Sequence, residues 1–224
     1  MQSVFKKILL ISLLFTGNLY AQKELFWGEI AHHSSVFSRI DEYKAVFLPS
    51  NSWETCQRVH YLQGADSASL MEIHKGKRPA PSSYLCPNYI AVHLSTFLQG
   101  GSLLVPKDVL DKYGRALIGR PDNTLFIISK EQMDCLLEEA DGSIDRIEAA
   151  LGVPNGYWSG RIICRIDIPH PENFHIRMPS GNEQGVNALW LPGGYLWQGY
   201  REAIIDRVPE GAYVETVIKV KDKK

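Results

Sequence analysis

The sequence predicts an α+β fold in a single domain, with a sheet core and short helices, from three observations. The β-rich runs Thr124–Ile128 and Arg161–Ile168 stand on either side of a helical middle at 129–151. Two further short runs, Ala203–Ile205 and Ala212–Val220, follow closely and are expected to be the last two strands. Strands before and after a helical middle indicate α+β rather than a regular alternation of strand and helix.

The first half of the chain gives weaker signals. Ala45–Leu48 is expected to be a short strand that ends in the turn at 49–52, and Gln57–Leu62 is a candidate second strand. A basic, proline-rich loop is expected over 75–87, with Lys75, Lys77 and Arg78 in solvent; contact with a phosphate or an acidic partner is the alternative. The segment 88–97 fits a helix and a strand equally well, and two glycines end it.

The second half begins with a predicted strand at 103–105 and a short helix at 107–113. After the strand 124–128, Ser129 and Gln132 resemble a capping box, which favours a helix from this point.

A second helix is expected at 144–151, with Ser143 as its cap and Gly152 at its end. Alternation in the next strand predicts arginines on one face and, on the other, a buried row of Ile162, Cys164, Ile166 and Ile168.

Net charge limits the class of partner. The 224 residues carry a formal net charge of -1, so no basic excess indicates a nucleic-acid backbone as ligand. No group of histidines or cysteines has the spacing of a metal site with a third ligand, and no metal site is predicted.

The N-terminus has the layout of a secretory signal peptide, predicted at residues 1–21. Two lysines precede an apolar run at 8–15, and a small residue stands before the expected cleavage point. The run is shorter than the roughly 20 apolar residues that a transmembrane helix needs, although an uncleaved anchor is the alternative. We therefore expect one mature domain over 22–224, without a membrane span, in the periplasm or outside the cell.

Four cysteines, Cys56, Cys86, Cys135 and Cys164, permit two disulfides in an exported chain. Three pairings are possible, and the sequence does not choose among them. The alternative is that Cys135, on the apolar side of a predicted helix, and Cys164, in a predicted strand, are buried free thiols.

The most unusual stretch runs from Ser180 to Glu202. Glycines, amides, a carboxylate and aromatics alternate in it without a helical or strand period, so we expect an irregular, mobile loop. Such loops between strands often carry binding groups. Trp190 and Trp197 are expected either to anchor the core or to stack on a planar ligand.

The order of three polar residues resembles the cholera-type ADP-ribosyltransferase toxins. Arg58 falls in an early predicted strand, Ser129 closes the strand 124–128, and Glu202 opens a late strand after the loop. The resemblance implies a split-sheet core and a site for NAD, with Arg58 holding the dinucleotide, Ser129 shaping the pocket and Glu202 doing the chemistry. His60 is an alternative ligand of the first strand, and Trp197 a candidate stacking residue for NAD.

These roles fit the chemistry of the bond between ribose and nicotinamide. Its cleavage passes through an oxocarbenium-like state, which a nearby carboxylate stabilises. A guanidinium suits a pyrophosphate because its planar fork offers paired donors.

The chain departs from the family at two positions. Ser129-Lys130-Glu131 stands where the family has Ser-Thr-Ser, and Tyr200 precedes Glu202 where arginine-modifying members have a second acid or an amide. We therefore do not expect arginine to be the residue that accepts ADP-ribose. Transfer to another acceptor and hydrolysis of NAD are the two alternatives.

A second set of motifs resembles a toxin module found at the C-termini of bacterial polymorphic secreted toxins. The resemblance implies that the protein is a toxin or effector more firmly than it implies which reaction it catalyses. It further implies a macromolecular acceptor, expected to be a protein. A delivery subunit or a cognate immunity protein would be a further partner. The motifs are Leu151-Gly152, Ile166–Pro169, Met178–Glu183, Gly185–Asn187, Trp190–Gly194 and Glu202-Ala203.

Two other functions remain open. A nuclease would use His60, His93 or His175 as general acid or base. A non-enzymatic secreted binding protein would use the aromatic, glycine-rich loop as its recognition surface. On either reading, Ser129 is only a helix cap and Glu202 a solvated carboxylate at a strand edge.

Overall fold

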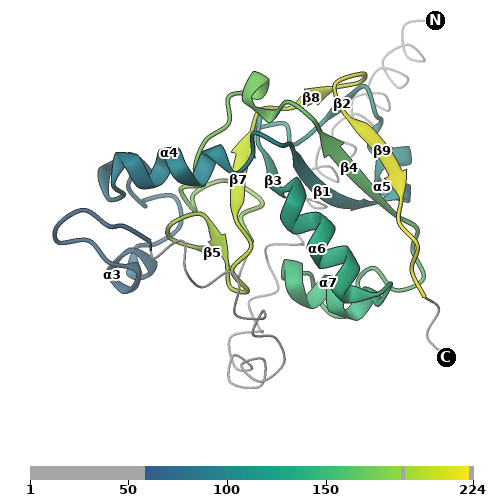
Figure 1. Ribbon diagram of the computed structural model, residues 1–224, viewed down its shortest axis with the longest axis horizontal. Helices are drawn as coiled ribbons and strands as arrows, with labels where there is room; N and C mark the ends of the chain where they lie inside the picture. Colours follow the sequence, from purple (N-terminus) through teal and green to yellow (C-terminus); the bar gives the residue numbers. More distant parts are fainter. Residues whose placement is uncertain (1–58, 188–189, 222–224) are drawn as a thin grey trace, which may run out of the picture.

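The computed structural model describes residues 59–187 and 190–221. Its core is a five-stranded antiparallel sheet in the order β7-β3-β1-β4-β9 (Figure 1). The bounds are β1 Gly101–Pro106, β3 Leu125–Ser129, β4 Ile163–Ile168, β7 Glu202–Ile205 and β9 Val214–Val217. The predictions for residues 1–58, including the signal peptide, the early strand at 45–48 and Arg58, lie outside the described residues.

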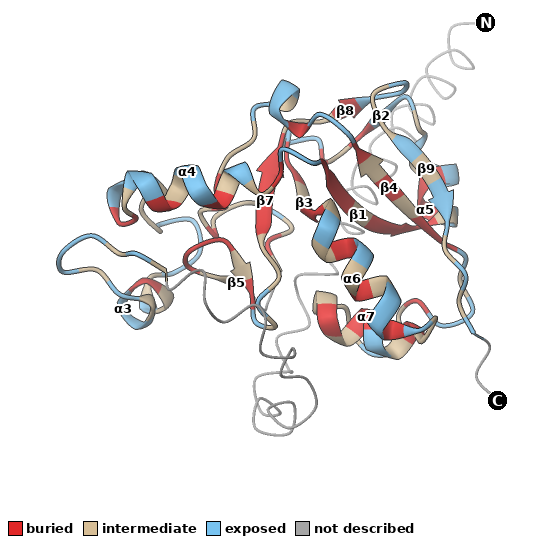
Figure 2. Ribbon diagram, viewed as in Figure 1, coloured by how far each residue is buried: buried red, intermediate tan, exposed pale blue. Residues whose placement is uncertain are grey.

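Alternation along the strands gives the sheet two apolar faces. Successive side chains of β1 point to opposite faces, so Leu104 lies on one face and Val105 on the other. Strands β1 and β7 are buried along most of their length (Figure 2). The Val105 face packs against α5 (Lys107–Tyr113) and against Phe97. Both faces are therefore covered, and the sheet lies inside the protein.

The predicted strand at 161–168 begins two residues later than expected. Cys164, Ile166 and Ile168 are fully buried as predicted, but Ile162 is 56% exposed because it precedes the strand. Arg165 projects from the opposite face, as expected, yet it is not in solvent. Its guanidinium forms ion pairs with Asp134 at 2.6 Å and Asp167 at 2.7 Å.

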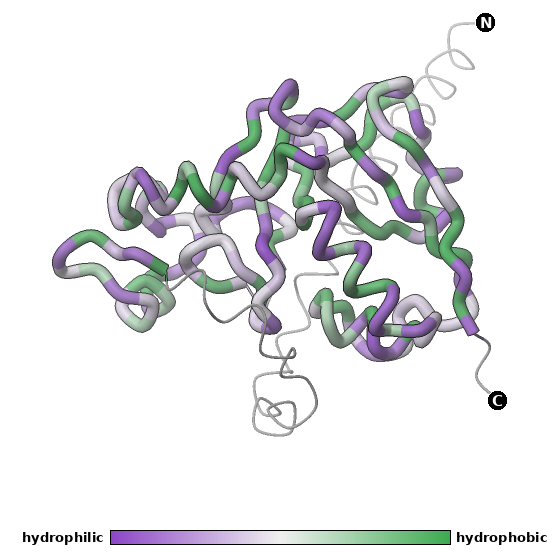
Figure 3. Tube along the Cα trace, in the orientation of Figure 1, coloured by the Kyte–Doolittle hydropathy of each residue, from purple (hydrophilic) through white to green (hydrophobic). Residues whose placement is uncertain are grey.

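Two helices cover the Leu104 face of the sheet. They are α6 (Lys130–Ala140) and α7 (Ile144–Leu151), which match the predicted helices. Hydrophilic residues predominate along α6, with hydrophobic ones at intervals that face the sheet (Figure 3). Both helices end at residues in the left-handed region, Asp141 at φ 48° and Gly152 at φ 68°.

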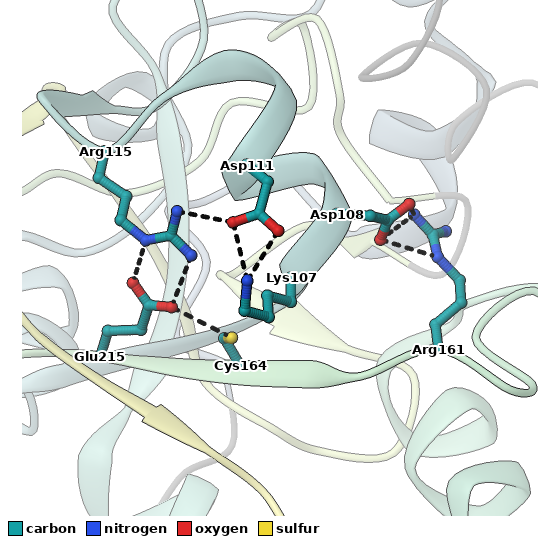
Figure 4. Close-up of polar contacts among 7 residues, drawn as sticks. All are labelled: Lys107, Asp108, Asp111, Arg115, Arg161, Cys164 and Glu215. Carbon is teal, nitrogen blue, oxygen red and sulfur yellow. Dashed lines mark hydrogen bonds and ion pairs between the residues drawn. The ribbon is translucent and has the colours of Figure 1, made fainter.

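Helix α5 is joined to the β4 and β9 side of the sheet by a polar network (Figure 4). Arg115, just after the helix, forks onto Glu215 of β9 at 2.5 and 2.9 Å, and its third nitrogen reaches Asp111. Asp111 also binds Lys107 at 2.7 Å, and Arg161 pairs with Asp108. The network fixes α5 over β4 from both ends.

A smaller layer lies beyond the β7 edge of the sheet (Figure 1). It contains α3 (Ser67–Glu72), the short 3-10 turn η2 (Pro81–Ser83) and α4 (Pro87–Ser95). The segment 88–97, which was ambiguous in the sequence, is helical as far as Ser95, and Pro87 occupies the first turn, where a proline is tolerated. Its own apolar cluster includes Leu70, Tyr84, Leu85, Tyr89 and Met178.

The remaining elements are short. Two-residue strands β2 (Leu117–Ile118) and β8 (Val208–Pro209) pair with each other, as do β5 (Trp190–Leu191) and β6 (Tyr195–Leu196). A 3-10 turn, η3 (Pro171–Phe174), follows β4. The predicted α+β class is confirmed.

Cys86, Cys135 and Cys164 are free thiols, and none of the three is bonded to another. Cys56 lies outside the described residues. Burial raises the pKa of Cys164 to about 11, with a further contribution from its hydrogen bond to Glu215, so this thiol is neutral at pH 7. Among the helices of residues 59–187 and 190–221, none has the length and apolar content to cross a membrane.

Candidate functional site

The sheet brings Ser129 and Glu202 to the same end of two paired strands, with side chains that alternate to opposite faces. Strand β3 ends at Ser129, strand β7 begins at Glu202, and the two strands pair so that Ile128 stands opposite Glu202. Ser129 is therefore one residue beyond the partner of Glu202 on the neighbouring strand. Both residues are buried.

The backbone of Glu202 is held on two sides. Its N–H donates to the carbonyl of Gly194 at 2.8 Å, and its carbonyl accepts from His93 Nε2 at 3.1 Å. A side chain at position 194 would come within 3.0 Å of His93 and within 2.7 Å of Met178, which explains the glycine there. The start of β7 is thus fixed by backbone contacts rather than by its side chain.

The side chain of Glu202 is in an unfavourable environment for a charge. Its Oε2 is buried and has no hydrogen-bond partner among the residues that the structure describes. Burial, and after it the nearby charge of Glu183, raises the pKa of Glu202 to about 8. At pH 7 the carboxyl is mostly protonated. Glu202 is therefore not the solvated strand-edge carboxylate that the simplest interpretation expected.

Ser129 caps helix α6, but the predicted capping box does not form. The Ser129 hydroxyl accepts from the N–H of Gln132 at a long 3.4 Å. The Gln132 Oε1 accepts from the Ser129 hydroxyl at 3.4 Å and from the N–H of Arg201 at 2.7 Å, instead of bonding the N–H of Ser129 as a capping box requires. Gln132 thereby ties the start of α6 to the residue that precedes Glu202.

The segment 180–202 is more ordered than the sequence suggested. The hairpin β5–β6 forms within it, and Val186, Trp190 and Leu196 are buried. The hairpin tip is held by Tyr89, whose hydroxyl donates to the Gly193 carbonyl at 2.6 Å. The expectation that this stretch has no regular structure is wrong, because its aromatic and aliphatic residues reach a core formed by distant parts of the chain.

Before the hairpin, Glu183 closes a tight turn. Its carboxylate accepts from the N–H groups of Ser180 and Gly181, both at 2.9 Å, and from the Ser180 hydroxyl at 2.7 Å. The neighbouring Asn182 reaches the loop at 73–78, where its Oδ1 accepts from the N–H of Gly76 at 2.7 Å. These contacts join two segments about a hundred residues apart in sequence.

His93 is a structural residue of this region. It lies on α4, is fully buried and has Tyr195 edge-on at 5.3 Å. Because a carbonyl only accepts, Nε2 carries the proton and donates to the Glu202 carbonyl. Burial lowers the pKa of His93 to about 4, so it is neutral at pH 7. Its Nε2 is committed to the start of β7, which gives His93 a positioning role here.

The other predicted residues fall in different surroundings. His60 is exposed and its ring lies parallel to Tyr89, with centroids 6.2 Å apart. His175, the other histidine considered, is exposed and 3.8 Å from Asp206. Trp197 is 37% exposed and follows β6 in the connection to β7. Arg58 lies outside the described residues, so its place beside Ser129 and Glu202 stays a prediction.

Two arginines lie near this site; the sequence marked Arg78 only as part of the basic loop and did not single out Arg120. The guanidinium of Arg78 lies 4.7 Å from the centre of the buried Trp190 ring and donates to the Gly181 carbonyl at 2.8 Å. Arg120 is buried and donates to Gln184 Oε1 at 3.1 Å. The only signal was indirect, since both arginines stand in turn-rich segments that the sequence marked as loops.

No group of three or more histidine, cysteine, aspartate or glutamate residues in the described ranges converges as metal ligands would. Comparison with family models and with curated proteins finds no match for this chain.

Proposed function

We propose that the chain is an exported toxin or effector that binds NAD and either transfers ADP-ribose to a macromolecule or hydrolyses the dinucleotide. Glu202 is the reacting carboxyl, Ser129 braces the pocket, and Arg58, His60 and Trp197 contact NAD. The proposal extends the resemblance in residue order to the cholera-type ADP-ribosyltransferase toxins. The proposal also states that the α+β fold is, more specifically, the split-sheet core of those toxins.

One observation carries the proposal. The Glu202 carboxyl is buried at the start of β7, opposite Ile128 of β3, and its Oε2 has no hydrogen-bond partner among the described residues. A buried polar atom without a partner costs about 1 to 3 kcal/mol, more for a charged group. A fold that retains such a cost in a strand fixed by its backbone suggests that the carboxyl has a ligand to meet.

NAD supplies the missing partner for this carboxyl. Its nicotinamide ring is positively charged, and a positive charge against Glu202 favours the ionised form and lowers its pKa. The ionised carboxylate then stabilises the positive ribose that develops as the bond to nicotinamide breaks. In this account the raised pKa of the free protein falls when the substrate binds.

Ser129 and Gln132 supply positioning rather than chemistry. The Ser129 side chain is fixed at the start of α6, and Gln132 holds the backbone of residue 201. Together they set the position of β7 relative to β3, and so the direction from which Glu202 meets the ribose.

The test uses the mature chain and NAD labelled separately in nicotinamide and in adenine. Release of nicotinamide supports the proposal. Adenine label in acid-precipitable protein indicates transfer, whereas soluble ADP-ribose indicates hydrolysis. No nicotinamide release, with unchanged toxicity of a Glu202→Ala variant on expression, contradicts the proposal.

A further inference from the structure

A cavity lies between the Val105 face of the sheet and helix α5. Its walls come from β1, α5 and β2, with Val105, Val109 and Ile118 among the lining residues. Glu202 stands opposite Ile128, whose side chain belongs to the cluster under α6 and α7 on the other face. The sheet therefore separates this cavity from the candidate catalytic carboxyl.

The interior of the cavity is mainly aliphatic. Leu103, Val105, Val109, Leu110 and Ile118 line it, and all but the first of these are buried. The described residues that line it include no acidic side chain. Such walls favour an aliphatic occupant, because binding removes the apolar surface of both from water.

The volume of the cavity limits the size of an occupant. It is about 80 Å³. A single water needs roughly 10 to 15 Å³ of such space, whereas a cavity of about 150 Å³ takes benzene. A short aliphatic chain therefore fits, and a ring the size of benzene needs more room.

One cation, Arg207, also lines the cavity. Its Nε is buried without a hydrogen-bond partner, and its guanidinium makes no hydrogen bond or ion pair within residues 59–187 and 190–221. Asp206, the acid beside it in sequence, is already paired with Arg177 at 2.8 Å. Arg207 therefore presents donors that have no acceptor in the described part of the chain, an unfavourable arrangement for a buried group.

The base of the Arg207 side chain is fixed against the cavity wall. A Cβ on Gly119, which also lines the cavity, would come within 2.7 Å of Arg207 Cγ and 3.2 Å of its Cα. The two segments approach this closely because position 119 has no side chain, and its φ of 125° also favours glycine. The N–H of Arg207 donates to Asn123 Oδ1 at 3.1 Å, and the next residue, Val208, is fully buried and pairs with Ile118. Arg207 thus belongs to a well-anchored segment.

We infer that this cavity binds a short aliphatic carboxylate, with the chain against α5 and β1 and the carboxylate at Arg207. The carboxylate supplies the acceptor that the guanidinium lacks among the described residues. A guanidinium suits a carboxylate because its planar fork offers paired donors. The inference does not depend on the proposed function, since the cavity and Glu202 lie on different sides of the sheet.

The experiment measures binding of pentanoate to the mature chain by ligand-observed NMR at neutral pH. Acetate, butanoate and pentylammonium are the comparison ligands. We expect each methylene added between acetate and pentanoate to tighten binding about fourfold. Pentylammonium has the same chain and the opposite charge, and it should not bind. This comparison uses wild type alone, so it decides the inference even where a variant does not fold.

Two variants test the two parts of the cavity. Arg207→Gln removes the charge and should weaken pentanoate binding about tenfold or more. Leu117→Trp should abolish binding by filling the cavity, and the 40% exposure of Leu117 leaves room for a larger side chain at that position. Arg146→Gln is the matched control, because it removes the same charge from an exposed arginine on α7, which covers the other face. Its effect should be less than about twofold.

Three results overturn the site. They are no saturable binding of pentanoate by wild type, equal binding of pentanoate and pentylammonium, and equal losses in Arg207→Gln and Arg146→Gln. Binding of pentanoate that Leu117→Trp leaves unchanged would place the ligand elsewhere and also contradicts the inference.

Discussion

Two buried glutamates, Glu148 and Glu202, occupy opposite situations in this protein. Glu148 on α7 accepts from the N–H groups of Gly156 at 2.6 Å and Trp158 at 2.5 Å, so its carboxylate closes the loop after the helix. Glu202 is similarly buried, but its Oε2 has no hydrogen-bond partner in the described part of the chain. The two carboxyl groups are alike in burial and differ in the hydrogen-bond donors around them.

The backbone around each glutamate explains the contrast. The loop after α7 turns its N–H groups toward Glu148, and those groups would otherwise be unpaired. At Glu202 the adjacent backbone is already used, because the N–H bonds Gly194 and the carbonyl bonds His93. The same substitution, glutamate to glutamine, should therefore have opposite effects at the two positions.

The largest effect is expected for Glu202→Gln at alkaline pH. The folded pKa of about 8 is above the ordinary value of 4.5, so the folded state favours the protonated form. The stability associated with this group is complete below about pH 4.5 and is lost as pH rises to about 8. Glutamine avoids the buried charge, and we expect it to raise the free energy of unfolding at pH 9 by up to roughly 4 kcal/mol.

Urea denaturation at pH 4 and pH 9 checks this prediction. The gain in the variant should be present at pH 9 and small at pH 4. A Glu202→Gln variant that is less stable than wild type at pH 9 would mean that the carboxylate has favourable partners, as Glu148 does.

Glu148→Gln should destabilise the protein by about 2 kcal/mol at pH 7. An amide oxygen replaces a charged acceptor, and the amide nitrogen is brought against N–H groups that it cannot satisfy. Thermal or urea unfolding followed by circular dichroism measures the loss. An unchanged free energy of unfolding would show that the bonds to Gly156 and Trp158 add nothing.

Ser129→Ala should have the smallest effect on stability, a loss of about 0.5 to 1 kcal/mol. The bond that caps α6 is long, at 3.4 Å, so a value at the low end is expected. In the NAD assay the same variant should raise KM if Ser129 also lines the pocket. A change in stability without a change in KM would limit Ser129 to its role as a helix cap.

Local patterns predicted the parts of the fold that local interactions determine. The strand 124–128, its capping serine and the helix after it follow from apolar period and cap chemistry, and all three are present. Ser129 closes a strand and Glu202 opens one, as predicted.

Long-range contacts could not be read from the sequence. The bond of Gln132 to residue 201 replaces a capping box that its spacing favours, because a distant backbone N–H is the closer partner. The hairpin β5–β6 likewise depends on Tyr89, which comes from a helix a hundred residues earlier.

The central claim is that Glu202 acts on NAD as a carboxylate, and one measurement tests it most directly. Nicotinamide release is followed as kcat/KM between pH 6 and pH 9.5 for wild type, Glu202→Gln and Glu148→Gln. We expect the wild-type value to rise with pH to a plateau, with its midpoint near the pKa of about 8 in the free protein. Glu202→Gln should be lower than the plateau by about 10²-fold or more, whereas folded Glu148→Gln follows wild type. A Glu202→Gln variant that releases nicotinamide at the wild-type rate would contradict the account.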